Sequence, residues 1–312
     1  MSLFIPEYDS LRIHEMMLLD SVRTAAYQSA IEASVRPGDI VLDIGTGTGV
    51  LALFAARAGA GKVYAVEPTG IVELARRLAE RNGFASRIEF IRARVEEIEL
   101  PEKVDCIVSE WMGVFALQEN MLPSIASARD RLLKPGGKML PESVWLFLAL
   151  AEAGKLHDRR IGCWQRRPYG LDYSDFAGCQ ANNVHAVAVE PEMLLSDPVE
   201  VTRLDLQQVR GSRLDVRVVL TAARAGVCHG LGGWFRAQFP EGIVLDTAPT
   251  QPLTHWNQAF FPTLDPIPLR AGEKAAVRLA AEPEGAVVHF SWEIVTSSRG
   301  QASFSGDTRR FP

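Results

Sequence analysis

The chain has 312 residues, of which 47% are hydrophobic, and its formal net charge at pH 7 is −5. A chain of this length and apolar content can bury the cores of two domains, which excludes wholesale disorder. Acidic and basic residues are mixed along the chain without a basic tail or stripe, which argues against nucleic acid as the main partner.

The cysteines and the amino-terminal segment favour a reduced, cytoplasmic setting. Residues 1–17 carry several charged side chains and do not resemble a signal peptide, and no uncharged apolar run reaches about 18 residues. We therefore expect no membrane span. The cysteines show no CxxC spacing, so we expect neither a metal site nor a disulfide framework. They are Cys106, Cys163, Cys179 and Cys228.

The first predicted elements alternate between helices and strands. Residues 1–35 have apolar side chains at helical spacing and are predicted to form amino-terminal helices and a lid. The following strands are expected at 39–44, 62–67, 88–91 and 104–109, and the helices at 50–59, 69–82 and 119–133. This alternation predicts a parallel sheet covered on both faces, that is, a doubly wound Rossmann-like α/β domain over residues 36–140.

The pattern changes after about residue 140. Short alternating stretches such as 214–221, 275–279 and 287–294 are separated by glycine and proline clusters. They predict a mostly antiparallel, barrel-like β domain over residues 141–312. A polar segment at about 158–184 interrupts it, and its mixture of aromatic and polar side chains is typical of an interface.

A glycine-rich turn follows the first strand, with Gly45, Gly47 and Gly49 in place of the dinucleotide spacing GxGxxG. Asp43 precedes the turn, where it would repel a pyrophosphate but not a cationic sulfonium nucleoside. Glu67 ends the second strand, where a carboxylate can accept both ribose hydroxyls. The pattern favours a nucleoside site, and the alternatives are a purely structural turn or another type of nucleotide site.

Two glutamates, Glu110 and Glu119, follow the fourth strand and flank an apolar segment. Carboxyl ends of strands carry the ligand site in doubly wound sheets. Two nearby carboxylates in an apolar setting repel one another, and the planar fork of a guanidinium would resolve the repulsion by binding both. Alternatively, Glu119 caps the next helix and Glu110 is solvated.

Taken together, the motifs resemble the protein arginine methyltransferase family over nearly the whole chain. The double-glutamate and Thr-His-Trp motifs, in this order, are the specific part of the resemblance. The matching segments are IHEMMLLDSVRT at 13–24, VLDIGTGTGVL at 41–51, AVEPTG at 65–70, RVEEIELP at 94–101, SEWMGVFALQENM at 109–121 and THW at 254–256.

The resemblance implies S-adenosylmethionine as cofactor and assigns residues to it. Arg23 would pair with the cofactor carboxylate, and Glu67 would bind the ribose. The remaining cofactor residues would be Asp43, Gly45 and Gly47 near the methionine part, and Val95 and Glu96 at the adenine.

The resemblance also implies the substrate site. Glu110 and Glu119 would clamp an arginine guanidinium for direct in-line methyl transfer, and His255 would pair with Asp20 and close the pocket. The remaining substrate residues would be Met17 and Trp256, together with Tyr8 in a shortened lid. Met17 and His255 match the asymmetric-dimethylating subtype.

The resemblance also bears on the partner and on the class of substrate. The 158–184 segment lies where the family inserts a helical arm, which implies a homodimer. The substrate is expected to be arginine in proteins or peptides. One alternative is free arginine or another small guanidino compound, which the short lid favours. A second alternative is a cofactor-binding scaffold without catalysis.

Overall fold

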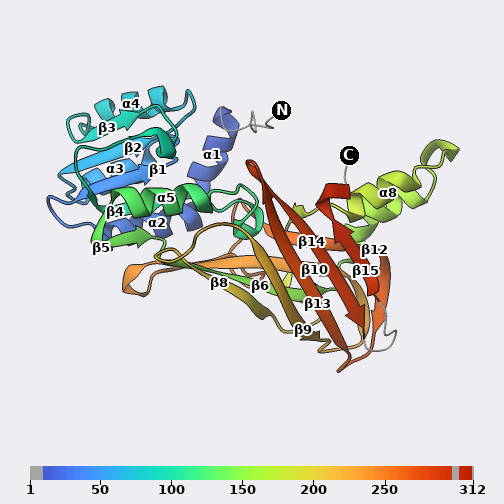
Figure 1. Ribbon diagram of the computed structural model, residues 1–312. Helices are drawn as coiled ribbons and strands as arrows, with labels where there is room; N and C mark the ends of the chain where they lie inside the picture. Colours follow the sequence, from blue (N-terminus) through green and yellow to red (C-terminus); the bar gives the residue numbers. More distant parts are fainter. Residues whose placement is uncertain (1–9, 297–301, 311–312) are drawn as a thin grey trace.

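The computed structural model describes residues 10–296 and 302–310, and its first part is a parallel sheet covered by helices (Figure 1). The sheet has the strand order β3-β2-β1-β4-β5, and every neighbouring pair is parallel. Its strands are β1 (Ile40–Ile44), β2 (Lys62–Val66), β3 (Ile88–Ile91), β4 (Val104–Ser109) and β5 (Leu133–Leu140). The order reverses between β1 and β4, which places a crevice at the carboxyl ends of these two strands.

Five helices accompany this sheet. They are α1 (Leu11–Leu19), α2 (Ser21–Ser34), α3 (Val50–Arg57), α4 (Val72–Arg81) and α5 (Leu122–Leu132). The central strands β1 and β4 are almost fully buried, because helices cover both faces of the sheet. In α1, by contrast, only His14 is buried. The predicted Rossmann-like fold is confirmed.

The second part of the chain is antiparallel. One sheet has the order β7-β12-β10-β6-β8, with β11 beside β10, and the other has the order β15-β14-β13-β9. The strands are β6 (Ser143–Ala151), β7 (His185–Val187), β8 (Val199–Asp205), β9 (Leu214–Thr221), β10 (Gly226–Gln238), β11 (Val244–Asp246), β12 (Gln258–Leu269), β13 (Lys274–Glu284), β14 (Val287–Thr296) and β15 (Ala302–Asp307). Strands β8 and β9 meet on one side and β12 and β15 on the other, which gives the predicted barrel-like arrangement.

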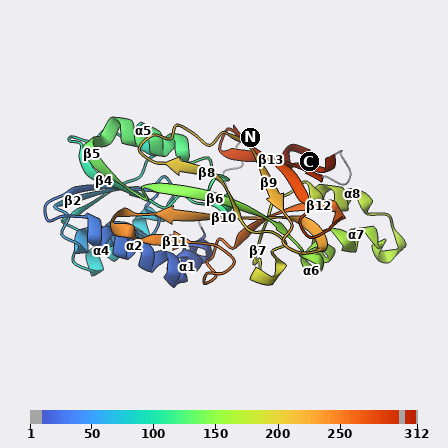
Figure 2. The same ribbon diagram turned by 90° about the horizontal axis from the view of Figure 1, so that it is seen from below.

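A helical arm projects from the antiparallel part, at the end of the molecule far from the parallel sheet (Figures 1 and 2). It contains α6 (Gly154–His157), a π-helical turn (Asp158–Gly162), α7 (Cys163–Gln165) and α8 (Ser174–Ala181). Small apolar side chains hold it together around Ile161, Ala177 and Ala181. The arm occupies the segment that the sequence marks as polar and aromatic.

The structure departs most from the prediction at the two ends of α5. The helix expected over 119–133 begins at Leu122, with Pro123 in its first turn, so Glu119 lies in the preceding loop. The Lys134-Pro135-Gly136-Gly137 sequence, expected to follow the helix as a stop, lies within β5. An edge strand tolerates proline and glycine at a bulge, and the pairing with β4 does shift there.

The domain limits stay a prediction. The parallel sheet ends at Leu140 and the antiparallel part begins at Ser143, but α2 contacts elements of both. The Tyr27 ring of α2 packs edge-on against Phe239, with 4.9 Å between ring centroids. Within the described ranges, no helix combines the length and the apolar character that crossing a membrane requires.

Candidate functional site

The glycine turn after β1 requires glycine for two reasons. Gly45, Gly47 and Gly49 have φ values of +70°, +53° and +82°, a region that other residues rarely adopt. A Cβ on Gly47 would lie 3.1 Å from Cε1 of His14, because α1 passes over the turn. Within the described part of the chain, a Cβ on Gly45 would meet no atom within 4 Å, which leaves room for a ligand beside the backbone there.

Asp43 lies beneath this turn and is fully buried. Its Oδ2 accepts hydrogen bonds from Thr46 Oγ1 at 2.5 Å and from the Ala52 amide at 3.0 Å. Its Oδ1 has no partner among the residues that the structure describes. Burial, followed by the charge of Glu67, raises the pKa of Asp43 to about 7, although the two hydrogen bonds oppose the rise. A buried, unpaired carboxylate oxygen fits a cationic or hydrogen-donating ligand.

Glu67, at the end of β2, is fixed by the same turn. Its Oε2 accepts from the Gly47 amide at 3.0 Å and its Oε1 from the Thr69 amide at 2.9 Å. Each carboxylate oxygen retains a further lone pair, so Glu67 can accept two hydroxyl protons without losing these bonds. The turn, Asp43 and Glu67 together fit the polar part of a cationic nucleoside.

The two residues expected at the adenine lie next to α5. Val95 is buried, and its carbonyl accepts from Arg131 Nη2 at 2.7 Å. The Glu96 carboxylate accepts a hydrogen bond from the Ser124 hydroxyl. Both residues are thus held against α5, Val95 through its carbonyl and Glu96 through its carboxylate.

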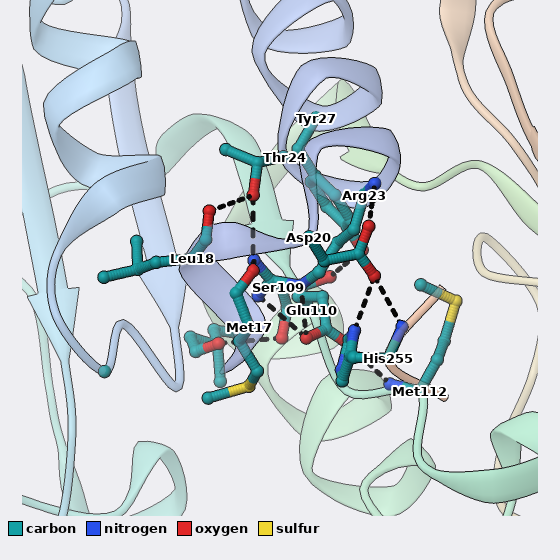
Figure 3. A network of polar contacts seen from close by, with 12 residues as sticks. Met17, Leu18, Asp20, Arg23, Thr24, Tyr27, Ser109, Glu110, Met112 and His255 are labelled. Carbon is teal, nitrogen blue, oxygen red and sulfur yellow. Dashed lines mark hydrogen bonds and ion pairs between the residues drawn. The ribbon is translucent and has the colours of Figure 1, made fainter. Parts of the chain in front are cut away.

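Arg23 and Glu110 form a buried ion pair at the crevice (Figure 3). Nε and Nη2 of Arg23 donate to Glu110 Oε2 at 3.0 and 2.8 Å, and the two side chains are only 7% and 8% exposed. Glu110 Oε1 accepts from the Met112 amide at 3.0 Å. The sequence prediction paired Arg23 with the cofactor carboxylate. That pairing stays a prediction, and in the structure the buried guanidinium of Arg23 has Glu110 as its partner.

Glu119 comes from the same loop, three residues before the first residue of α5. A Cβ on Gly113 would lie 2.7 Å from Glu119 Oε1, so the carboxylate lies directly against the Gly113 backbone. Both glutamates therefore belong to one loop at the carboxyl end of β4, as the sequence predicts.

Asp20 and His255 join α1 and α2 to the antiparallel part (Figure 3). His255 Nδ1 lies 2.8 Å from Asp20 Oδ2, and the His255 amide donates to the same oxygen at 2.8 Å. Asp20 also caps α2 by accepting from the Arg23 amide at 2.9 Å. Burial alone would raise the pKa of Asp20, but these hydrogen bonds outweigh it and hold the pKa below its ordinary value. The pair that the resemblance implied is therefore present.

The other expected substrate residues are less clearly placed. The Met17 carbonyl faces Arg23 Nη1 and Thr24 Oγ1, each at 3.4 Å. The Trp256 ring is buried edge-on against Phe235, with 5.2 Å between centroids, and lies beside His255. It belongs to the core, which favours a structural role. Tyr8 lies outside the described residues.

Tyr27 is a site residue that the sequence prediction missed. It is fully buried, and its hydroxyl donates to the Ser109 carbonyl at 3.0 Å. Ser109 Oγ in turn donates to the Ile44 carbonyl at 2.8 Å, which ties α2 to the ends of β4 and β1. Burial raises the pKa of Tyr27 well above its ordinary value, so the hydroxyl remains a donor. Its position four residues after Arg23, on the same helix face, was the available signal.

Comparison with known proteins gives matches over most of the chain. Residues 41–137 match a model of a methyltransferase domain, and residues 142–293 match a model of the arginine methyltransferase oligomerization subdomain. The chain is 36% identical to protein arginine N-methyltransferase 1 of Saccharomyces cerevisiae, over 90% of this chain and 83% of that protein. It is 39% identical to protein arginine N-methyltransferase 6 of Danio rerio, over 90% of this chain and 84% of that protein.

Solved structures give the same picture. The PRMT1 enzyme–prozyme heterotetrameric complex with AdoHcy from Trypanosoma brucei superposes with a TM-score of 0.89 at 32% identity, covering 96% of this chain and 98% of that one. The open conformation of protein arginine methyltransferase 10 from Arabidopsis thaliana superposes with a TM-score of 0.82 at 32% identity, covering 96% and 99%.

Proposed function

Since the chain belongs to the protein arginine N-methyltransferase family, we propose that it transfers methyl groups from S-adenosylmethionine to arginine side chains of proteins. The observation that carries the proposal is Glu110, which already accepts two N–H groups of a buried guanidinium, that of Arg23. It does so beside a turn built for a cationic nucleoside. A carboxylate that binds a guanidinium at this place suits an arginine substrate.

Each part of the cofactor has its own candidate binding residue. Bound S-adenosylmethionine supplies a methyl group on a sulfonium, ready for displacement. Glu67 would accept the ribose hydroxyls, and the open Oδ1 of Asp43 would serve the methionine part near Gly45. Arg23 would bind the cofactor carboxylate, which would make Glu110 available to the substrate. Val95 would bind the adenine through its backbone.

The two glutamates act on the substrate guanidinium. Its pKa is above about 12, so its nitrogens are poor nucleophiles. Glu110 and Glu119 orient one nitrogen towards the methyl group and hold the positive charge on the others. Orientation and a fixed charge in a buried site both lower the barrier.

The Asp20–His255 pair is suited to take the proton late. The pKa of Asp20 is lowered, so its carboxylate is ionised at neutral pH and favours the imidazole tautomer that carries its proton on Nδ1 and accepts at Nε2. Glu119 is the other candidate. Asp20→Asn removes the carboxylate that orients the His255 ring. It should therefore change the pH profile of turnover if His255 takes the proton, and leave the profile unchanged if Glu119 does.

We also propose a homodimer in which the arm docks on α1 and α2 of a second copy. Tyr169, between α7 and α8 of the arm, is 95% exposed, and Leu19 of α1 is 74% exposed. The arm lies too far from its own α1 to cover it (Figure 2). The match to an oligomerization subdomain supports this assembly. The four cysteines are free, which supports the cytoplasm as the compartment.

The experiment that tests the function is transfer of labelled methyl groups to three acceptors: arginine-rich peptides, free arginine and a cell lysate. We expect label on peptides and lysate proteins. Label on free arginine alone would replace the proposal with a small-molecule methyltransferase. Cofactor binding without transfer to any acceptor would indicate a scaffold.

A further inference from the structure

The loop that carries both glutamates is held from outside by the turn between β13 and β14. In Figure 1 this hairpin reaches from the antiparallel sheets to the loop that precedes α5. Asn120 Nδ2 donates to the Gly285 carbonyl at 2.7 Å, and the Val288 amide donates to the Gln118 carbonyl at 3.2 Å. These two hydrogen bonds fix Gln118 and Asn120, the residues on either side of Glu119.

The loop itself has a backbone that needs such support. Phe115, Ala116 and Asn120 have φ values of +56°, +56° and +49°. Non-glycine residues rarely adopt this region, and asparagine tolerates it better than most. A strained backbone persists only where its surroundings fix it. Here the amide of Asn120 both suits the conformation and supplies the bond to the hairpin.

The other side of Glu119 is fixed as well. Its carboxylate lies against Gly113, where a Cβ would be 2.7 Å from Oε1. The Phe115 ring packs edge-on against Phe261 and Phe290, at centroid distances of 5.3 and 6.2 Å. Phe290 belongs to β14, so this strand contacts the loop through a buried aromatic ring. The same strand also contacts the loop near its first residue, through the Val288 amide.

We infer that Asn120 is a positioning residue for methyl transfer, and that the β13–β14 turn sets the place of Glu119 through it. The inference rests on the proposed function, because it assumes that Glu119 acts on the substrate. Asn120 acts through Glu119 and not on the substrate itself. The antiparallel part of the chain thereby helps to position a catalytic side chain of the parallel part.

The turn offers a way to break the bond without removing Asn120. The pairing of Glu284 with Val287 leaves Gly285 and Ala286 as a two-residue turn, and of these only Gly285 has positive φ. This fits a type II′ turn. An Asn-Gly sequence favours type I′, in which the central peptide is flipped. The double change Gly285→Asn with Ala286→Gly should therefore keep the hairpin but turn the residue 285 carbonyl away from Asn120.

The second variant, Asn120→Gly, breaks the same bond from the other side. Glycine tolerates the positive φ but lacks the side-chain amide that donates to Gly285. Asn82→Gly is the control, since Asn82 Nδ2 donates to the Leu78 carbonyl at 2.8 Å at the end of α4, in another part of the fold. We expect Asn120→Gly and the turn variant each to lower kcat about 10- to 100-fold. The KM for an arginine peptide and the affinity for S-adenosylhomocysteine should change little.

The two changes cut the same bond, so combining them should lower kcat no further than either one does. A kcat for Asn120→Gly within about twofold of the Asn82→Gly control would overturn the inference, as would losses that multiply in the combined variant. Glu119→Gln in the same assay separates failure of the proposed function from failure of the positioning role of Asn120. If that variant retains full turnover, the proposed role of Glu119 fails before the role of Asn120 is at issue.

Discussion

At the scale of single residues, the proposed function assigns the binding and orientation of the substrate to Glu110 and Glu119. Glu110→Gln or Glu119→Gln should lower turnover by about 10²- to 10³-fold or more, because each removes a charge placed against the substrate guanidinium. Steady-state kinetics with an arginine peptide measures the loss. Affinity for S-adenosylhomocysteine should be unchanged in Glu119→Gln. In Glu110→Gln it should not fall, because Glu110 competes for Arg23. Near wild-type turnover in either variant would show that its glutamate has another role.

Asp43 should give the folded protein a distinctive pH dependence. Its folded pKa of about 7 lies above the ordinary value of 3.8, so the folded state retains a proton that the unfolded chain loses near pH 4. This group therefore costs stability progressively as the pH rises from about 4 to about 7. Asp43→Asn cannot titrate. The free energy of unfolding of the variant, relative to wild type, should rise over that range and level off above it.

Urea unfolding of the ligand-free protein at several pH values measures this difference. Asp39→Asn is a suitable control, since Asp39 lies just before β1 and accepts from the Arg36 amide at an exposed site. A difference between Asp43→Asn and wild type that stays constant from pH 4 to 7 would mean that Asp43 is ionised throughout. Cofactor affinity of Asp43→Asn should fall in any case, because the open Oδ1 is replaced or neutralised.

At the scale of elements, the double-glutamate loop depends on a close approach between Phe115 and β10. A Cβ on Gly233 would lie 2.7 Å from Phe115 Cε2 and 3.0 Å from Phe261 Cε2. Gly233→Ala should therefore displace the Phe115 ring, cost about 1–3 kcal/mol of stability and lower kcat. Thermal unfolding and peptide kinetics measure both effects.

The neighbouring glycine supplies the control for this prediction. A Cβ on Gly232 would lie 3.7 Å from the nearest atom, in Val189, which is ordinary contact. Gly232→Ala should thus fold and turn over almost as wild type does. Equal losses in the two variants would mean that β10 rejects any side chain here and that Phe115 is not the cause.

The parallel sheet could be predicted from the sequence because apolar runs, glycines and their order are local signals. The site motifs after β1, β2 and β4 were placed correctly for the same reason. The start of α5 was not, because Pro123 permits a helix to begin at Leu122 whereas charge and periodicity extend back to Glu119. The Arg23–Glu110 pair could not be predicted either. It joins residues 87 positions apart in the sequence, and the sequence prediction assigned each of them to a ligand and not to the other.

At the scale of the whole molecule, the arm should govern assembly. Deleting residues 164–183 should give a monomer with weaker cofactor affinity, because a docked arm supports the helices that carry Asp20 and Arg23. Light scattering and calorimetric titration with S-adenosylhomocysteine measure both properties. A single change, Phe176→Glu, should weaken the dimer by charging an exposed aromatic of α8.

Val219→Glu is the matched control, since Val219 of β9 is also exposed and apolar but lies outside the arm. It should leave the dimer intact. An active wild-type protein that scatters as a monomer at micromolar concentration would refute the proposed assembly. Loss of the dimer with cofactor affinity unchanged would separate assembly from binding.

The most direct test of the account is to locate the transferred methyl group. An arginine-containing peptide is incubated with S-adenosylmethionine and the protein, and fragment masses are read by tandem mass spectrometry. We expect a methyl group on an arginine side chain with wild type, and none with Glu119→Gln or on a peptide in which lysine replaces arginine. A methyl group on lysine, on a carboxylate or on the peptide terminus would contradict it.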